Sequence, residues 1–110
     1  MLLGRVTQTK GKEGVRYVGL DVGMNSLLRP ALYGAHHDIV NLSRLDAPDT
    51  GRAQIVGPIC ESGDRLGIDR AFPDTEEGDV VLIDVAGAYG RVMASHYNLR
   101  EPAREVVLAD

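Results

Sequence analysis

The sequence has very little cysteine, few aromatic residues and no long apolar run. One cysteine, one phenylalanine and no tryptophan occur in its 110 residues. A single cysteine excludes an internal disulfide and fits a reducing, cytoplasmic compartment. No apolar run approaches the roughly 20 residues of a membrane-spanning helix, and no charged-then-apolar leader is present. We therefore expect a soluble cytoplasmic protein with no membrane partner.

Clustered positive charge is also missing. The formal net charge is −4, and phosphate backbones are bound by concentrated lysine and arginine, so the composition argues against nucleic acid. The only lysines are Lys10 and Lys12. A small molecule or another protein is the expected partner.

The length of the chain is sufficient for one folded domain. A chain of this length buries roughly two-thirds of the surface that its unfolded form exposes, without a metal or disulfide. Because aromatic residues are scarce, the core must consist mainly of Val, Leu, Ile and Ala. No repeat or linker is found, so residues 1–110 are expected to form a single domain.

Short apolar and β-branched segments, separated by Gly, Pro and Asp turns, dominate the chain. With no regular alternation of strands and helices, they predict a mainly β fold, an antiparallel barrel or sandwich with one or two short helices. Residues 2–9 and 15–20 are expected to form a hairpin, and the apolar residues 80–85 a central strand. Further strands are expected at residues 35–42, 52–59, 64–70 and 105–108.

Other segments are less regular. Residues 24–33 are expected to cross the domain irregularly with short helical turns, because Pro30 prevents a long helix. Residues 91–97 are expected to make a helical turn or two, and the acidic residues 72–79 to be only a solvated bend. Asp21 is expected to close a turn on its own backbone.

His36 and His37 resemble a metal-binding pair only superficially. Adjacent residues of a strand point to opposite faces, so the two imidazoles are poorly placed to share one ion.

Residues 57–64 (GPICESGD) concentrate more chemistry than any other segment, on a connection between two predicted strands. Cys60 by itself is more often a small buried hydrophobic residue than a reactive one. The neighbouring Glu61 opposes formation of a thiolate, so Cys60 is a poor nucleophile. A thiol with an ordinary pKa of about 8.5 is mostly protonated at neutral pH, however, and is a reasonable proton donor.

Four motifs occur in an order and spacing that resemble a known family. They are residues 21–25 (DVGMN), 29–33 (RPALY), 60–64 (CESGD) and 87–90 (GAYG), with Tyr97 and Asn98 following. Together they resemble the C-terminal domain of the diaminopimelate decarboxylases, in the ornithine/arginine/diaminopimelate decarboxylase family of the alanine racemase-like fold group. The resemblance extends from about Gly4 to Leu108.

The resemblance implies roles for residues near the substrate. Cys60 would be the proton donor and Glu61 a substrate contact, both reaching into the active site of the other subunit of a homodimer. Arg29 and Tyr33 would bind the carboxylate at the far end of the substrate.

Two further residues take roles from the same resemblance. Tyr89 would contact both cofactor and substrate, and Asp64 would help to tie the two subunits together. Without the family, Arg29 would be interpreted as a surface ion pair, and the two tyrosines as core or interface aromatics with even weight.

The chain also departs from the family. Members carry pyridoxal phosphate on a lysine inside an N-terminal (β/α)₈ barrel, for which this chain has no room. Lys10 and Lys12 lie in a predicted hairpin turn and are poor candidates to hold the cofactor. We therefore expect the chain to be one part of a carboxy-lyase that converts meso-2,6-diaminopimelate to L-lysine and CO₂, the last step of lysine biosynthesis, and to be inactive alone.

Two alternatives remain open. One is the same domain of an ornithine or arginine decarboxylase, although those siblings tend to place a shorter aspartate after the cysteine, so Glu61 favours diaminopimelate. The other is a non-catalytic β-barrel that binds a ligand or mediates dimerisation, which the lack of a suitable lysine favours.

Overall fold

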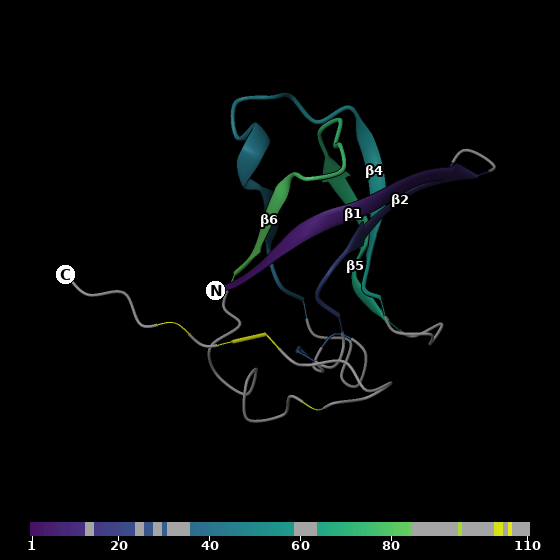
Figure 1. Cartoon of the computed structure of the whole chain (residues 1–110). Helices are drawn as coiled ribbons and strands as arrows, with labels where there is room; N and C mark the ends of the chain where they lie inside the picture. The colour runs from purple at the N-terminus through teal and green to yellow at the C-terminus, as the bar shows by residue number, and fades with distance from the viewer. Residues whose placement is uncertain are drawn as a thin grey trace.

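The fold is a single curved sheet of short strands, seen in a computed structural model that describes residues 1–12, 15–23, 26–27, 30, 36–58, 64–84, 95, 103–104 and 106. The elements are β1 (Leu2–Lys12), β2 (Val15–Leu20), β3 (Ile39–Asn41), the 3₁₀ helix η1 (Leu42–Arg44), β4 (Gly51–Val56), β5 (Arg65–Phe72) and β6 (Val80–Ile83) (Figure 1). Within these described parts, no helix is both long and apolar enough to cross a lipid bilayer.

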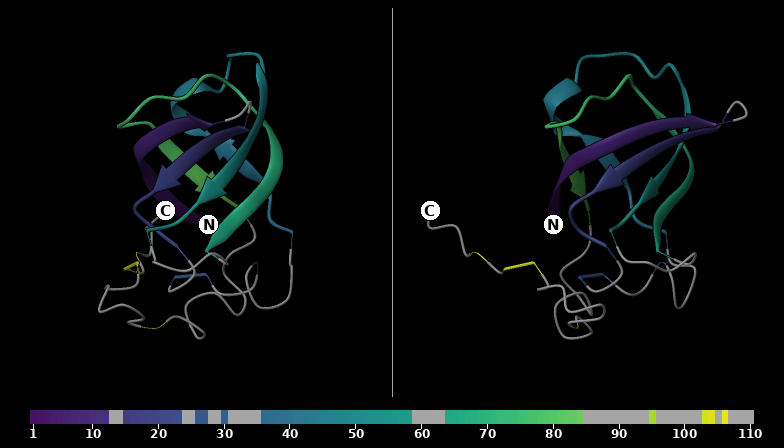
Figure 2. Two further views of the ribbon diagram at one scale, coloured as in Figure 1. Left: turned by 90° about the vertical axis from the view of Figure 1, so that its right-hand side faces the viewer. Right: turned by 45° about the vertical axis from the view of Figure 1, so that its right-hand side comes forward.

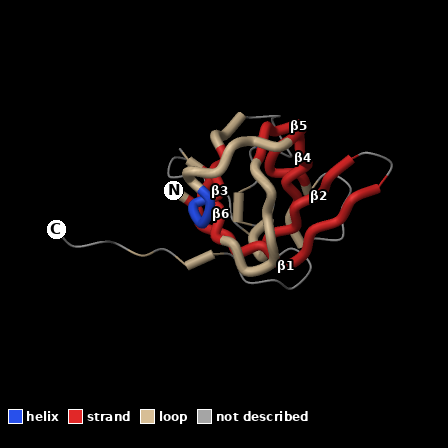
Figure 3. Tube along the Cα trace, turned by 90° about the horizontal axis from the view of Figure 1, so that it is seen from above, coloured by secondary structure: helices blue, strands red, loops and turns tan. Residues whose placement is uncertain are grey.

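The strands form one sheet in the order β3-β6-β1-β2-β4-β5. The sheet curls round so that its two ends approach each other, giving a nearly closed barrel (Figure 2). Seen from above, the strands follow one another around a ring in the same order (Figure 3). The predicted mainly β fold is confirmed, as a barrel.

Pairing in the sheet is antiparallel except between β2 and β4, which run parallel from the Arg16–Ala53 pair to the Gly19–Val56 pair. The predicted antiparallel pairing therefore holds at every pair of the described sheet except this one. Parallel neighbours need a long crossover connection, and here residues 21–50, which include β3 and η1, return the chain to the end at which β2 begins.

We call the junction between β3 and β5, at the two ends of the strand order, the seam. Nη1 of Arg70 crosses it and donates a hydrogen bond to the carbonyl of His37 at 2.7 Å. Cδ1 of Ile39 lies 2.7 Å from the position that a Cβ on Gly67 would occupy. The seam therefore closes through side chains, and a Cβ at position 67 would require the Ile39 side chain to shift.

The core lies inside the barrel and is almost entirely aliphatic. Inward-facing residues of the strands are buried, among them Val18, Leu20, Ile55 and Ile83; Phe72, 1% exposed, is the one aromatic among the buried residues that the structure describes. Each such side chain contributes about 1.5–3 kcal/mol on burial. The predicted Val, Leu, Ile and Ala core is confirmed.

Several predicted boundaries hold. β1 and β2 pair as a hairpin down to Lys12 and Val15, while the turn residues between them lie outside the described residues. β6 pairs with β1 on one side and β3 on the other, which confirms the predicted central strand. The helical turn at residues 91–97 and the strand at 105–108 fall almost wholly outside the described residues.

Candidate functional site

Three segments that carry the predicted motifs are attached at one end of the barrel. The described residues that flank them are Gly23 after β2, Pro58 after β4, Asp64 before β5 and Asp84 after β6. We call this end, formed by residues 21–23, 26–27, 36–38, 57–58, 64 and 84, the loop end. Loops held by a rigid scaffold are where functional residues usually gather.

Two glycines and a buried carboxylate fix the centre of the loop end. Asp64 is 3% exposed. A Cβ on Gly23 would lie 2.7 and 2.9 Å from its two carboxylate oxygens, and a Cβ on Gly57 would lie 2.5 and 2.6 Å from them. The Gly57 Cβ would also collide with the backbone of Gly23. Only glycine at both positions leaves room for Asp64.

The base of the loop predicted to carry Cys60 is closed by the backbone. The amide of Gly57 donates to the carbonyl of Asp64 at 3.0 Å, so β4 and β5 are joined where the loop leaves and returns. Pro58 packs beside Gly23, its Cδ 2.8 Å from where a Cβ there would stand. The two ends of the loop are thus held against the end of β2.

The chain after β2 makes a turn at the same place. The amides of Ser26 and Leu27 both donate to the carbonyl of Gly23, at 2.9 and 3.1 Å. The hydroxyl of Ser26 accepts a hydrogen bond from the amide of Ala103 at 2.9 Å. A segment from the far C-terminal part of the chain is therefore bound to the loop end as well.

Asp21 extends the β1–β2 pairing. Its Oδ1 accepts from the Arg5 amide at 2.9 Å, and its own amide donates to the Arg5 carbonyl at 3.0 Å. The prediction that it closes a turn on its own backbone is wrong, because the neighbouring strand offers a donor and an acceptor at the correct register.

Of the six predicted site residues, one lies within the described part of the chain and five lie outside it. Asp64 is described and buried, while Cys60, Glu61, Arg29, Tyr33 and Tyr89 lie outside the described residues. The structure therefore places the ends of the segments that hold these five residues, and it leaves their mutual geometry as a prediction.

The two adjacent histidines turn to different partners. Nδ1 of His37 lies 3.1 Å from the carbonyl of Asp84, and because a carbonyl only accepts, Nδ1 carries the proton. Nε2 of His37 is buried and has no hydrogen-bond partner among the described residues. His36 is exposed, with Nε2 3.3 Å from Oδ1 of Asp38. Within the described part of the chain, no group of three or more metal-ligating side chains is found.

The opposite end of the barrel holds a polar cluster that sequence reasoning missed. Oδ2 of Asp79 accepts from Nε of Arg44 at 2.8 Å, from Nδ2 of Asn41 at 3.1 Å and from the amide of Glu76 at 3.0 Å. Nη2 of Arg44 also pairs with Glu76 at 3.0 Å. The prediction that residues 72–79 form only a solvated bend is therefore wrong at Asp79, which is 8% exposed.

The hydrogen bonds around Asp79 control its ionisation. Burial by itself would raise the pKa of Asp79, but the hydrogen bonds from Arg44, the Glu76 amide and Asn41 outweigh it and lower the pKa. The same contact with Asp79 raises the pKa of Arg44. The sequence carries no joint signal for this cluster, because position 79 is distant in the chain from positions 41 and 44.

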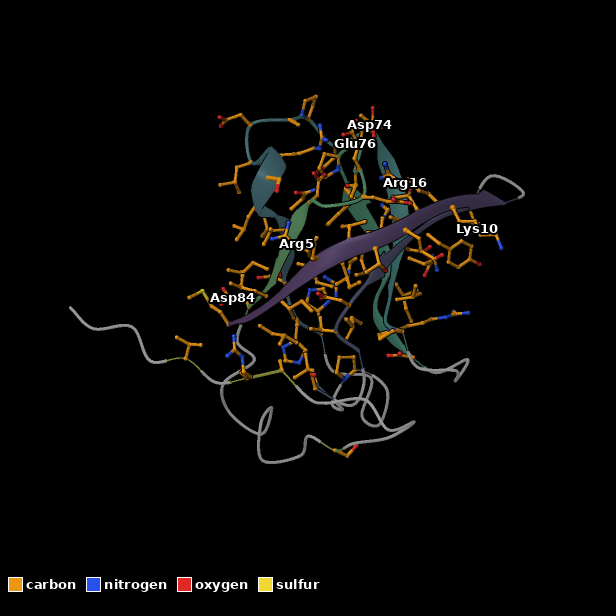
Figure 4. All side chains as sticks on the ribbon, viewed as in Figure 1. Arg5, Lys10, Arg16, Asp74, Glu76 and Asp84 are labelled. Carbon is orange, nitrogen blue, oxygen red and sulfur yellow. The ribbon has the colours of Figure 1, made fainter. Side chains whose placement is uncertain are left out.

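Arg16 joins several segments at the end of the barrel that holds the Asp79 cluster. Its guanidinium donates to the carbonyls of Phe72 at 2.7 Å, Pro73 at 3.0 Å and Gly51 at 3.3 Å. Nη1 also lies 3.7 Å from Asp74 (Figure 4). These hydrogen bonds join β2 to the beginning of β4 and the end of β5, at the end of the barrel opposite the loop end.

The described residues do not fit a site for a cofactor carried on lysine. Lys10 is exposed on β1, and it projects from the hairpin away from Asp84 at the loop end (Figure 4). A lysine that carries such a cofactor is normally desolvated and held in place.

Comparison with known proteins gives a consistent result. Residues 1–87 match the family described as "Pyridoxal-dependent decarboxylase, C-terminal sheet domain". The chain is 51% identical over 107 residues to the diaminopimelate decarboxylase of Neisseria meningitidis serogroup B, covering 97% of this chain and 25% of that protein. It is 43% identical over 109 residues to that of Archaeoglobus fulgidus, covering 99% and 26%.

The fold agrees. The crystal structure of diaminopimelate decarboxylase from Helicobacter pylori complexed with L-lysine superimposes with a TM-score of 0.82 at 39% identity, over 91% of this chain and 24% of that chain. The chain therefore spans about a quarter of the length of the proteins that it matches.

Proposed function

Because the chain belongs to the family of C-terminal sheet domains of pyridoxal-dependent decarboxylases, we propose that it acts as that domain in a diaminopimelate decarboxylase. The reaction would release CO₂ from meso-2,6-diaminopimelate and leave L-lysine. An N-terminal (β/α)₈ domain, in the same polypeptide or on a partner, would complete the enzyme. We place the enzyme in the cytoplasm, on the evidence of the single cysteine.

The observation that carries the proposal is the convergence at the loop end. The segments that contain Arg29, Tyr33, Cys60, Glu61 and Tyr89 all begin or end at residues that are held together there by described contacts. Side chains that must meet around one substrate need such an arrangement.

We assign the proton transfer to Cys60. When bound by the N-terminal domain, pyridoxal phosphate supplies an electron sink for the electrons left by the departing CO₂. The carbon that lost CO₂ must then receive a proton, and a neutral thiol on a short loop with a fixed base can donate it. Glu61 beside it keeps the thiol protonated and would contact the substrate.

Arg29 and Tyr33 would hold the distal carboxylate, because a planar guanidinium matches a carboxylate with two parallel hydrogen bonds. Tyr89 would contact both cofactor and substrate through its hydroxyl. Asp64 would act on the subunit interface through the loop that it supports, since its carboxylate is buried against Gly23 and Gly57. In a homodimer the Cys60 loop would complete the neighbouring subunit's site.

A chimera tests this function directly. The C-terminal quarter of the Neisseria meningitidis enzyme is replaced by this chain, which aligns with it over 107 residues, and decarboxylation is measured by release of lysine and CO₂. We expect turnover of meso-diaminopimelate in the chimera and none in the truncated enzyme without this chain. A folded chimera with bound cofactor and no turnover would contradict the proposal.

The same chimera separates the sibling activities. A distal carboxylate is present in diaminopimelate and absent from ornithine and arginine, so a clamp made by Arg29 and Tyr33 predicts strong preference for diaminopimelate. Preference for ornithine or arginine would assign the chain to a sibling enzyme.

A non-catalytic ligand-binding or dimerisation module is the second candidate, because Lys10 is exposed and lies away from Asp84 at the loop end. Pyridoxal phosphate added to the 110-residue chain should give no absorption band of a protein-bound cofactor. A stable band would show that the chain binds the cofactor alone.

A further inference from the structure

A small groove lies along the free edge of β5, at the seam. It encloses about 150 Å³ and is lined by residues of β5 together with one residue from each of two preceding segments: Pro30, His36, Arg65, Leu66, Gly67, Ile68 and Arg70. We call it the seam groove. It is separate from the polar cluster around Asp79 and from the contacts of Asp64.

The seam groove is locally cationic in a chain whose net charge is −4. Arg65 and Arg70 contribute guanidinium groups, and none of the described lining residues is a carboxylate. His36 stands at the groove with its Nε2 turned to Asp38. Guanidinium groups that no lining carboxylate neutralises are suited to binding carboxylates and phosphates.

An irregularity in β5 brings Arg70 into the groove. Ala53 pairs with Arg70 and Ile55 with Gly67, so β5 uses three steps where β4 uses two. Residues three apart in a regular strand point to opposite faces. The extra residue puts Arg70 on the same side as Gly67, and its Cγ lies 3.0 Å from where a Cβ on Gly67 would stand.

The extra residue is held in a strained conformation by β4. Asp69 has φ of 50° although it is not glycine. Its carboxylate accepts from Nε2 of the buried Gln54 at 2.5 Å, and its carbonyl accepts from Nη1 of Arg52 at 2.7 Å. Bulges of this kind re-aim side chains, and strained residues fixed by their surroundings concentrate at functional positions.

Arg70 is positioned before any ligand arrives. One of its five N–H donors is bonded to the His37 carbonyl. Among the described residues no other partner of this guanidinium is seen, and a fixed guanidinium loses less freedom on binding than a mobile one. Arg65 is exposed at the start of the same strand and supplies a second guanidinium.

We propose that the seam groove binds a small dianion, a dicarboxylate or a phosphate, between Arg65 and Arg70. Leu66, Gly67 and Ile68 supply the wall between the two cationic residues. None of the lining residues is one to which the proposed function assigns a role, although Pro30 directly follows Arg29 in the chain.

The test is an NMR titration of the ¹⁵N-labelled 110-residue chain, at neutral pH and low salt, with glutarate and separately with inorganic phosphate. We expect saturable shifts confined to the amides of β5 and residues 36–39. The more tightly bound probe identifies the ligand as a dicarboxylate or a phosphate. Shifts that fail to saturate with both probes, or that spread over the surface, would overturn the proposal.

Arg65→Gln is the deciding variant, because this exposed side chain can be changed without opening the seam. Loss of one charge-assisted contact should weaken binding by about tenfold to a hundredfold. Lys10→Gln removes the same charge from the distant hairpin and should change the affinity by no more than about twofold. If both variants weaken dianion binding equally, the binding reflects general charge attraction, and the proposed site is wrong.

Discussion

Asp79 illustrates how one carboxylate oxygen can join three segments of a fold. Because Oδ2 accepts from Arg44, Asn41 and the Glu76 amide, Asp79→Asn would remove the charge and leave donors poorly matched. We expect the free energy of unfolding at pH 7 to fall by about 1.5–3 kcal/mol. Urea denaturation measures this, with the exposed Asp49→Asn as a control that should change stability little.

The same residue gives the stability a pH dependence. The folded-state pKa of Asp79 is lowered from its ordinary value of 3.8, so the folded state binds its proton less readily than the unfolded state. The contribution is complete above that ordinary value and is lost as the pH falls through the folded-state pKa. The difference in stability between wild type and Asp79→Asn should therefore shrink in acid. A difference that stays constant from pH 7 to pH 2 would contradict this assignment.

Cys60 donates the proton to the substrate carbon in the proposed reaction. In the chimera, Cys60→Ala removes the proton donor and leaves the carboxylate clamp in place, so turnover should fall by about 10²–10⁴-fold with little change in the Michaelis constant. Ser62→Ala, in the same loop, controls for disturbance of the loop and should retain most of the turnover. An unchanged turnover number in Cys60→Ala would return this residue to a structural role.

At the scale of elements, the connection between β4 and β5 depends on the absence of a side chain at position 57. A Cβ there would stand 2.5 and 2.6 Å from the carboxylate oxygens of Asp64. Gly57→Ala should lower stability by about 1–3 kcal/mol through overpacking, and it should reduce turnover in the chimera by displacing the Cys60 loop. Thermal denaturation and steady-state kinetics measure the two effects.

Gly11→Ala is the matched control, because nothing lies within 4 Å of a Cβ at that position. It should change stability by no more than about 0.5 kcal/mol. If Gly57→Ala behaves in the same way, the close packing of Asp64 does not hold the loop.

Local pattern was sufficient to predict the strands and the core. The hairpin of β1 and β2 and the interior position of β6 follow from alternating or continuous apolar residues and from turn residues, which act over a few positions. The aliphatic core follows from composition alone. These features require no knowledge of what lies across the barrel.

What could not be predicted depends on contacts between distant positions. The parallel pairing of β2 with β4, the pairing of Asp21 with Arg5, and the burial of Asp79 between Arg44 and Asn41 each join residues far apart in sequence. The positive φ of Asp69 likewise depends on Gln54 from another strand. For the site, the sequence motifs supplied the candidate residues, whose roles stay predictions, whereas the fold places the described residues that flank their segments at one end of the barrel.

At the scale of the whole molecule, the proposed dimer makes a quantitative prediction. A two-fold interface repeats each contact, so each site would combine the cofactor lysine of one subunit with the Cys60 loop of the other. Mixing the Cys60→Ala chimera with a chimera that lacks its cofactor lysine gives about half mixed dimers, each with one working site. Activity should recover to about a quarter of the unmodified chimera.

Subunit exchange must be shown independently, for example by mass spectrometry of differently labelled chains. If exchange occurs and activity stays at the level of the separate variants, the Cys60 loop serves its own subunit.

The order of strands around the barrel also constrains synthesis on the ribosome. β1 lies between β2 and β6, yet β2 begins at Val15 whereas β6 begins only at Val80. At roughly 5–20 residues per second, the second partner of β1 emerges about 3 to 14 s after β1 itself is complete. During that interval the hairpin has an unpaired edge next to apolar side chains such as Leu2 and Leu3, and such an edge can pair with another nascent chain. The delay follows from the strand order, which pairs β1 with a strand that comes late in the chain. Slower translation therefore lengthens the time for which the edge of β1 is unpaired, even when the finished barrel is stable.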